Sequence, residues 1–168
     1  MGAQEKLRVH REQIIGQWVK VLLDSYPAEG GKFFGRKTNE FSNPVGATFK
    51  KNIAALFDLL AEEDDIEKGR STVDGIVRIR AVQGFSASQA VAPLFAIRGI
   101  IRSCLGEDTG AFEGQLERRL EKLVLLAFDQ YMACREILWQ QKANSLYNRT
   151  HRLLEKHKLL RETDDEGV

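Results

Sequence analysis

The chain has 168 residues, 43% hydrophobic and 29% charged, a length and composition typical of a single soluble domain with a real core. Its 25 basic and 24 acidic residues leave a formal net charge of +1, so no overall field attracts a phosphate backbone and we expect no nucleic-acid partner. No stretch approaches the ~18 apolar residues of a membrane-spanning helix, and the N-terminus lacks the apolar core of a signal peptide. We therefore expect a cytoplasmic protein without membrane insertion.

The apolar residues of the N-terminal part recur with helical spacing. A first helix is predicted from about Gln4 to Ser25, stopped before Pro27, and a loop follows. Asn43 before Pro44 is typical of a helix N-cap with proline at the first helical position. A second helix is therefore predicted from Pro44 to the acidic run at residues 62–65.

The third predicted helix carries a guanidinium and an amide on its apolar face. At about 100° per residue, that face consists of Val73, Ile76, Val77, Arg80, Gln83 and Gly84. A buried charge without partners costs several kcal/mol, so Arg80 must be paired with a carboxylate or carbonyls, or must open onto a cavity or an interface. Two interpretations stay open: Arg80 and Gln83 form a binding site, or they tie helices together.

The remaining faces of this helix give two further predictions. Ile79 and Val82 are apolar on the opposite side, as in a central helix enclosed by neighbours. Arg78 lies four residues after Asp74 on the polar face. This spacing predicts an ordinary surface ion pair.

A fourth helix is predicted from about Ala87 to Leu105, after a break at Gly84. Ser86 and Gln89 have the spacing of a capping box, and Pro93 removes a hydrogen bond inside the helix, so a kink is expected. A second stripe of small side chains allows another backbone to pack tightly, which we expect, or leaves a groove: Ala92, Ala96, Gly99 and Ser103. The candidate ligand- or partner-binding residues are Arg80, Gln83, Ser86 and Gln89.

The last predicted helix is long, because no helix breaker follows Gly110 until Gly167. Apolar residues recur every seven positions along it, a spacing that favours a left-handed seam: Leu125, Met132, Trp139, Leu146, Leu153 and Leu160. We expect residues 1–143 to form a sensory or interaction domain and residues 144–168 to extend the helix as a possible coiled coil.

Dimerisation is expected through Trp139, Leu146, Leu153 and Leu160. The alternate seam positions are mostly cationic, at Arg135, Lys142, Arg149 and Lys156, so a coiled coil standing alone is weak. The alternative is a monomer whose last turns fold back through a break near residues 144–148.

Reactive groups are sparse along the chain. The three histidines, His10, His151 and His157, lie in polar surroundings near the ends, where none is placed to ligate a haem iron. Cys104 and Cys134 lie among apolar helical residues, which indicates a reducing compartment, and have no histidine nearby in sequence. We expect no catalytic residue, no metal and no cofactor, and therefore no enzyme.

Three segments of the chain together carry a resemblance to a known family. They are Asn43-Pro44-Val45-Gly46, Asp74-Gly75-Ile76-Val77-Arg78-Ile79-Arg80-Ala81-Val82-Gln83 and Phe85-Ser86-Ala87-Ser88-Gln89-Ala90-Val91. The chain resembles the N-terminal domain of the RsbRD family, co-antagonists of the RsbT switch kinase in bacterial stress signalling, over about residues 14–131. The resemblance implies an all-helical, non-catalytic sensory or interaction module with a protein partner.

We therefore predict an all-α, single-domain bundle of about five helices with a long C-terminal helix. The alternative is a globin-like arrangement without haem, because related co-antagonists have such input domains. In function, we predict a dimeric bacterial signalling module. A ligand or partner favouring one packing around Arg80, Gln83 and the Pro93 bend shifts a two-state equilibrium that the long helix transmits. The alternative is a small-molecule sensor whose apolar pocket is anchored by Arg80.

Overall fold

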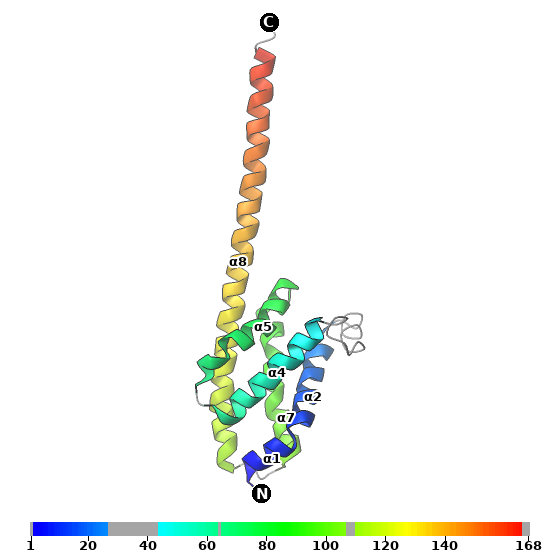
Figure 1. The fold of residues 1–168 in the computed structure, drawn as a ribbon. Coiled ribbons are helices and arrows are strands. Elements are labelled where there is room, and N and C mark those ends of the chain that lie inside the picture. Colours follow the sequence, from blue (N-terminus) through cyan, green and yellow to red (C-terminus); the bar gives the residue numbers. More distant parts are fainter. Residues whose placement is uncertain (1, 27–43, 64, 107–109, 166–168) are drawn as a thin grey trace. The chain divides into compact units, whose positions relative to one another are not determined.

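The structure is a computed structural model that describes residues 2–26, 44–63, 65–106 and 110–165 (Figure 1). Every regular element in these ranges is helical, so the all-α class is confirmed. In chain order the elements are α1 (Ala3–Val9), α2 (Arg11–Asp24), α4 (Pro44–Glu62), the 3₁₀ turn η1 (Ile66–Gly69), α5 (Arg70–Val82), α6 (Ala87–Val91), the 3₁₀ turn η2 (Ala92–Phe95), α7 (Ala96–Leu105) and α8 (Gly110–Asp165). The chain divides into two compact units, residues 1–132 and 133–168.

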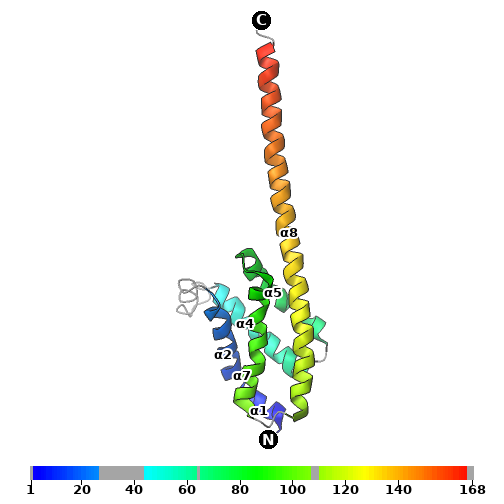
Figure 2. The same ribbon diagram turned by 180° about the vertical axis from the view of Figure 1, so that it is seen from behind.

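In the first unit α2 and α4 pack against each other, and each packs against further elements. α2 contacts both α4 and α7, and α4 in turn contacts α5 and η1. α4 lies toward the viewer in Figure 1, and α7 lies toward the viewer in Figure 2, which shows the molecule from behind. The fully buried apolar side chains include Trp18, Phe49, Ile53, Leu56, Leu94 and Ile97. This burial is the main stabilising contribution, at ~25 cal/mol per Å² of apolar surface removed from water.

The first predicted helix is in fact two helices. α1 ends at Val9 and α2 begins at Arg11, with His10 between them at φ −93° and ψ 6°. Neither glycine nor proline lies at this point, so local backbone preference does not explain the break. α1 contacts α7 and buries Leu7. We attribute the turn at His10 to this tertiary contact.

The second predicted helix is confirmed. α4 begins at Pro44 and ends at Glu62, and its apolar stripe is buried at Phe49, Ile53, Leu56, Phe57 and Leu60. The predicted Asn43 cap and the loop after Pro27 lie outside the described residues.

The fourth predicted helix is interrupted where Pro93 predicts a kink. The chain passes from α6 through the 3₁₀ turn η2, which contains Pro93, into α7. The small-residue stripe is not tightly packed, which corrects the prediction: Ala92, Gly99 and Ser103 are exposed, and a Cβ added to Gly99 meets no described atom within 4 Å. The reason is that α7 turns its larger side chains inward instead, at Ile97, Ile100, Ile101 and Leu105.

Trp18 joins α2 to the proline turn, because its indole Nε1 donates a 2.9 Å hydrogen bond to the carbonyl of Pro93. We expect Trp18→Phe to lower the free energy of unfolding by about 2 kcal/mol, through the lost bond and the smaller ring. Tyr147→Phe is the control, because Tyr147 is 69% exposed and lies outside the predicted seam. Urea denaturation measures both variants; equal midpoints for the two would contradict this role of Trp18.

The long last helix is confirmed, because α8 has 56 residues from Gly110 to Asp165. The alternative of a fold-back near residues 144–148 is wrong, because the helix continues through them. Residues 144–148 contain no proline or glycine, and their Asn and Ser side chains are solvent-exposed. The lower helix propensity of Asn and Ser is not enough by itself to end the helix. In the second unit every residue from Trp139 to Lys158 is exposed, while the side chain of Leu160 lies outside the described part. None of the helices in the described ranges is both long and apolar enough to cross a membrane.

Candidate functional site

Arg80 is fully buried, with 0% of its surface exposed, as its position on the apolar face of α5 predicts. Val73, Ile76 and Val77 are buried on the same face. Gln83 is exposed, which corrects its predicted burial. It caps the C-terminus of α5, where the backbone leaves helical geometry and the side chain turns to the surface. Val82 is 63% exposed, so α5 is not enclosed on two sides.

The guanidinium of Arg80 bridges two other elements through a single nitrogen. Nη2 donates hydrogen bonds to Oγ of Ser25, at 2.9 Å, and to the carbonyl of Gln89, at 2.8 Å. Gln89 lies four residues before Pro93, which has no N–H to donate to that carbonyl within a helix. Arg80 therefore satisfies an acceptor that Pro93 leaves without its helical donor, and in doing so ties α5 to α6 and to the end of α2.

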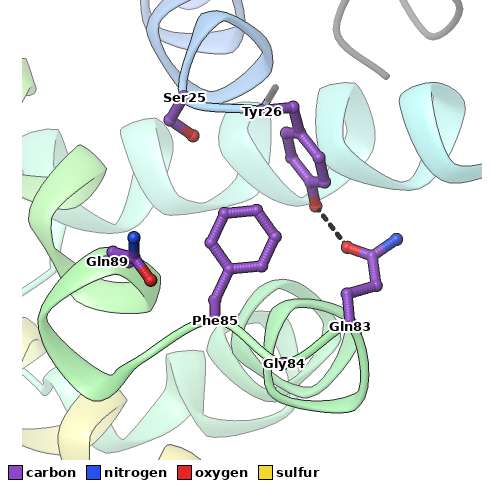
Figure 3. A pocket seen from close by; sticks show the side chains of 6 residues that line it. All are labelled: Ser25, Tyr26, Gln83, Gly84, Phe85 and Gln89. Atoms are coloured by element: carbon purple, nitrogen blue, oxygen red, sulfur yellow. Dashed lines mark hydrogen bonds between the residues drawn. The ribbon is translucent and has the colours of Figure 1, made fainter. Parts of the chain in front are cut away.

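Two aromatic rings flank the same guanidinium. Cζ of Arg80 lies 4.2 Å from the ring centroid of Phe85 and 5.0 Å from that of Tyr26, and the two rings meet edge to face. The Tyr26 hydroxyl donates to Oε1 of Gln83 at 2.8 Å (Figure 3). Burial lowers the pKa of Arg80 and raises the pKa of Tyr26, because desolvation disfavours the charged form of each. The ring faces offset part of this cost for the cation.

Nε and Nη1 of Arg80 are buried and have no hydrogen-bond partner among the described residues. No carboxylate is paired with Arg80 there either. The other buried arginine, Arg119 on α8, differs: its Nη1 donates to the carbonyls of Leu60 and Ala61 at the end of α4. The cation of Arg80 is thus packed and tethered but only partly satisfied.

Two surface grooves adjoin this cation and share Ser25 and Gln89. The larger, of about 600 Å³, is lined by Ser25, Tyr26, Gln83, Gly84, Phe85 and Gln89 (Figure 3). The smaller, of about 350 Å³, is lined by Val21, Ser25, Arg80, Gln89, Ala92 and Pro93. Of the predicted site residues, the structure therefore brings Arg80, Gln83 and Gln89 together.

Ser86 has a structural role instead. Its Oγ accepts a hydrogen bond from the Gln89 amide, and its own amide donates to Oε1 of Gln89, so the predicted capping box is confirmed. Ser86 lines neither of the two grooves. Gly84, before it, has φ +86°, a backbone conformation that residues with a Cβ rarely adopt. The conformation of the turn that carries Phe85 therefore depends on the positive φ of Gly84 and on the capping box of Ser86 and Gln89.

Sequence reasoning missed several residues that surround Arg80. Ser25, Tyr26 and Phe85 lie at the ends of helices, where the sequence pattern indicates only that a helix ends. Tyr131 of α8 donates from its hydroxyl to the carbonyl of Phe85 at 2.6 Å. Arg119 was detectable, because it occupies the buried face with Leu116, Leu120 and Leu123.

The described residues hold no group of three or more histidine, cysteine or acidic side chains able to bind a metal ion. Both cysteines are free thiols; Cys134 is buried and Cys104 half-buried.

The geometry defines an all-helical domain whose buried, partly satisfied arginine lies beneath two grooves. The family model of the RsbT co-antagonist protein rsbRD N-terminal domain matches residues 12–146. The chain belongs to this family, whose members are input domains of bacterial stress signalling. No curated protein and no solved structure matches the chain, so the globin-like alternative stays a prediction.

Proposed function

We propose that this protein is a non-catalytic, cytoplasmic input module that changes how its helices pack around Arg80 when it meets its signal. The signal is a protein partner or a small molecule that favours one packing over another. Family membership supports a protein partner in a pathway of the RsbT type. The predicted binding residues Arg80, Gln83 and Gln89 supply the polar groups at the site, and Ser86 holds the turn beside them.

The hydrogen bond between Tyr131 and Phe85 is the observation that carries this proposal. Phe85 stacks on Arg80, and its carbonyl is held by a side chain of α8. A shift of the turn at residues 83–86 therefore strains or breaks a bond to α8. Packed elements joined in this way have discrete arrangements rather than continuous ones, which is what a switch requires.

The output of the module is α8 and its seam. Trp139, Leu146 and Leu153 are exposed at seven-residue spacing, which is the pattern of a helix that pairs with a second helix. We propose that the protein is a homodimer through these positions and Leu160, and that the distal segment, residues 144–168, transmits the change. The cationic positions between them keep this pairing weak enough to respond to a modest bias.

Tyr131→Phe tests the coupling, because it removes only the hydroxyl that donates to Phe85. We expect a loss of about 1 kcal/mol in unfolding free energy and faster amide hydrogen exchange in the turn at residues 83–86 and in α8 near residue 131. Tyr147→Phe, at an exposed position of the same helix, is the control and should change neither. Exchange confined to the turn, with α8 unaffected, would show that α8 does not receive the signal.

Affinity capture from the native cell tests the partner. With the wild type and Tyr131→Phe as baits, we expect a partner whose recovery differs between the two, because the variant shifts the packing equilibrium. Tyr147→Phe should recover the same amount as the wild type. A partner recovered equally by all three baits would contradict a role for this bond in output.

A further inference from the structure

Arg80 retains more hydrogen-bonding capacity than the described residues use. A guanidinium has five N–H donors, of which two belong to Nη2 and are bonded to Ser25 and Gln89. The one on Nε and the two on Nη1 are buried and have no partner in the described part of the chain. Unpaired buried donors are unfavourable, so three of them on one cation indicate a position that an acceptor occupies in another state of the protein.

The smaller groove determines what kind of acceptor fits. Val21, Ala92 and Pro93 form apolar walls, and Arg80 is the charged residue among those that line it. Its volume of about 350 Å³ lies near the lower end of the range for small-molecule sites. An apolar body therefore matches the walls, and one negative group matches the cation.

The ring of Phe85 covers one face of the guanidinium and leaves the N–H groups in its plane to other partners. Phe85 is half-buried, borders the larger groove and follows Gly84, whose positive φ only glycine adopts readily. The face of a phenyl ring attracts a cation more weakly than a carboxylate that hydrogen-bonds to it. An anion that hydrogen-bonds in the plane of the guanidinium therefore adds a stronger interaction than the ring provides, without displacing the ring.

We propose that the groove beside Arg80 binds a small monocarboxylate with an apolar body, whose carboxylate accepts a hydrogen bond from Nη1 in the plane of the guanidinium. A carboxylate carries one charge and lies in a plane, which matches one planar guanidinium. A phosphate dianion brings two charges to a site where the described residues place one cation. This inference rests on the proposed function, since an anion bound to Arg80 acts on the guanidinium against which Phe85 stacks, and the carbonyl of Phe85 is bonded to Tyr131.

Calorimetric titration of the full chain with sodium benzoate and sodium hexanoate tests the proposal. We expect saturable binding of at least one of them at millimolar concentration, with a matching rise in melting temperature. Benzamide and hexanamide keep the shape without the charge and should bind about ten-fold more weakly or not at all. Inorganic phosphate supplies charge without an apolar body and should not bind.

A groove-filling variant tests the location without altering Arg80. Ala92→Leu places a larger side chain in the smaller groove at an exposed position, and we expect it to weaken carboxylate binding about ten-fold while the ligand-free melting temperature stays unchanged. Ala55→Leu is the matched control, exposed on α4 and lining neither groove, and should bind like the wild type. Arg80→Met should abolish carboxylate binding, provided that this variant folds. If the Arg80→Met variant does not fold, Ala92→Leu still tests the site.

The proposal is overturned if neither carboxylate binds at tens of millimolar, if the amides bind as well as the acids, if phosphate alone binds, or if Ala92→Leu keeps full affinity. These outcomes are distinct from failure of the proposed function, which is read from hydrogen exchange of Tyr131→Phe without any ligand. If hydrogen exchange shows that the turn and α8 are coupled but no carboxylate binds, the proposed input module is still supported. Its signal is then a protein partner.

Discussion

Replacing Arg80 with alanine should lower the free energy of unfolding by about 3–5 kcal/mol. The substitution removes a fully buried side chain on which Phe85 and Tyr26 pack, and it leaves the Gln89 carbonyl without the donor that Arg80 supplies. Urea denaturation followed by circular dichroism measures the change. An unaltered midpoint would refute the central role of this side chain in the fold.

Two further variants separate packing from charge at this position. Arg80→Met keeps most of the volume and removes the desolvated cation, so we expect it to cost roughly half as much as alanine. Arg78→Ala is the surface control: Arg78 makes the predicted ion pair with Asp74 on the exposed side of the same helix, and its loss should cost about 0.5 kcal/mol. A methionine variant as unstable as the alanine variant would show that the hydrogen bonds of the cation, not its volume, hold the helices.

Leu146→Lys combined with Leu153→Lys should convert the proposed dimer into a monomer. The two leucines are 64% and 58% exposed, so lysine at either position disturbs no core, and the melting temperature of the folded domain should stay the same. In a paired helix, by contrast, the two lysines introduce like charges into the seam beside Lys142 and Arg149, where they repel across the interface. Sedimentation velocity reports the mass before and after the change.

A control pair has the same charge, spacing and helix but another face. Gln141→Lys with Asn148→Lys adds two lysines seven residues apart, away from the seam, and should leave the dimer intact. A wild-type protein that sediments as a monomer at all concentrations would remove the dimer from the proposal. Dissociation by the control pair would show that added positive charge, and not loss of the seam, weakens association.

The fold class and several local features were predictable because they depend on near neighbours in sequence. Helical periodicity, the start at Pro44 and the capping box of Ser86 and Gln89 each involve residues no more than a few positions apart. The burial of Arg80 followed from its place on an apolar face, which a single helix already defines.

Other features were not predictable because the reasons for them lie far away in the chain. The break at His10 has no local helix breaker, and most of the stripe of small residues in η2 and α7 is exposed because larger side chains on another face meet the core. Gln83 lies on the surface because α5 ends at Val82, two residues before the predicted apolar face ends at Gly84. Periodicity describes the face of a helix, not the point where the neighbouring helix stops covering it.

The sequence by itself determined that this protein is an all-α member of its family with one guanidinium inside and a long last helix. Only the tertiary structure decided what surrounds that guanidinium. Ser25 is 55 positions away, and the bond from Tyr131 to Phe85 spans 46 positions. Such contacts exist only once α2, α5, α6 and α8 have packed, because no local preference links residues so distant along the chain.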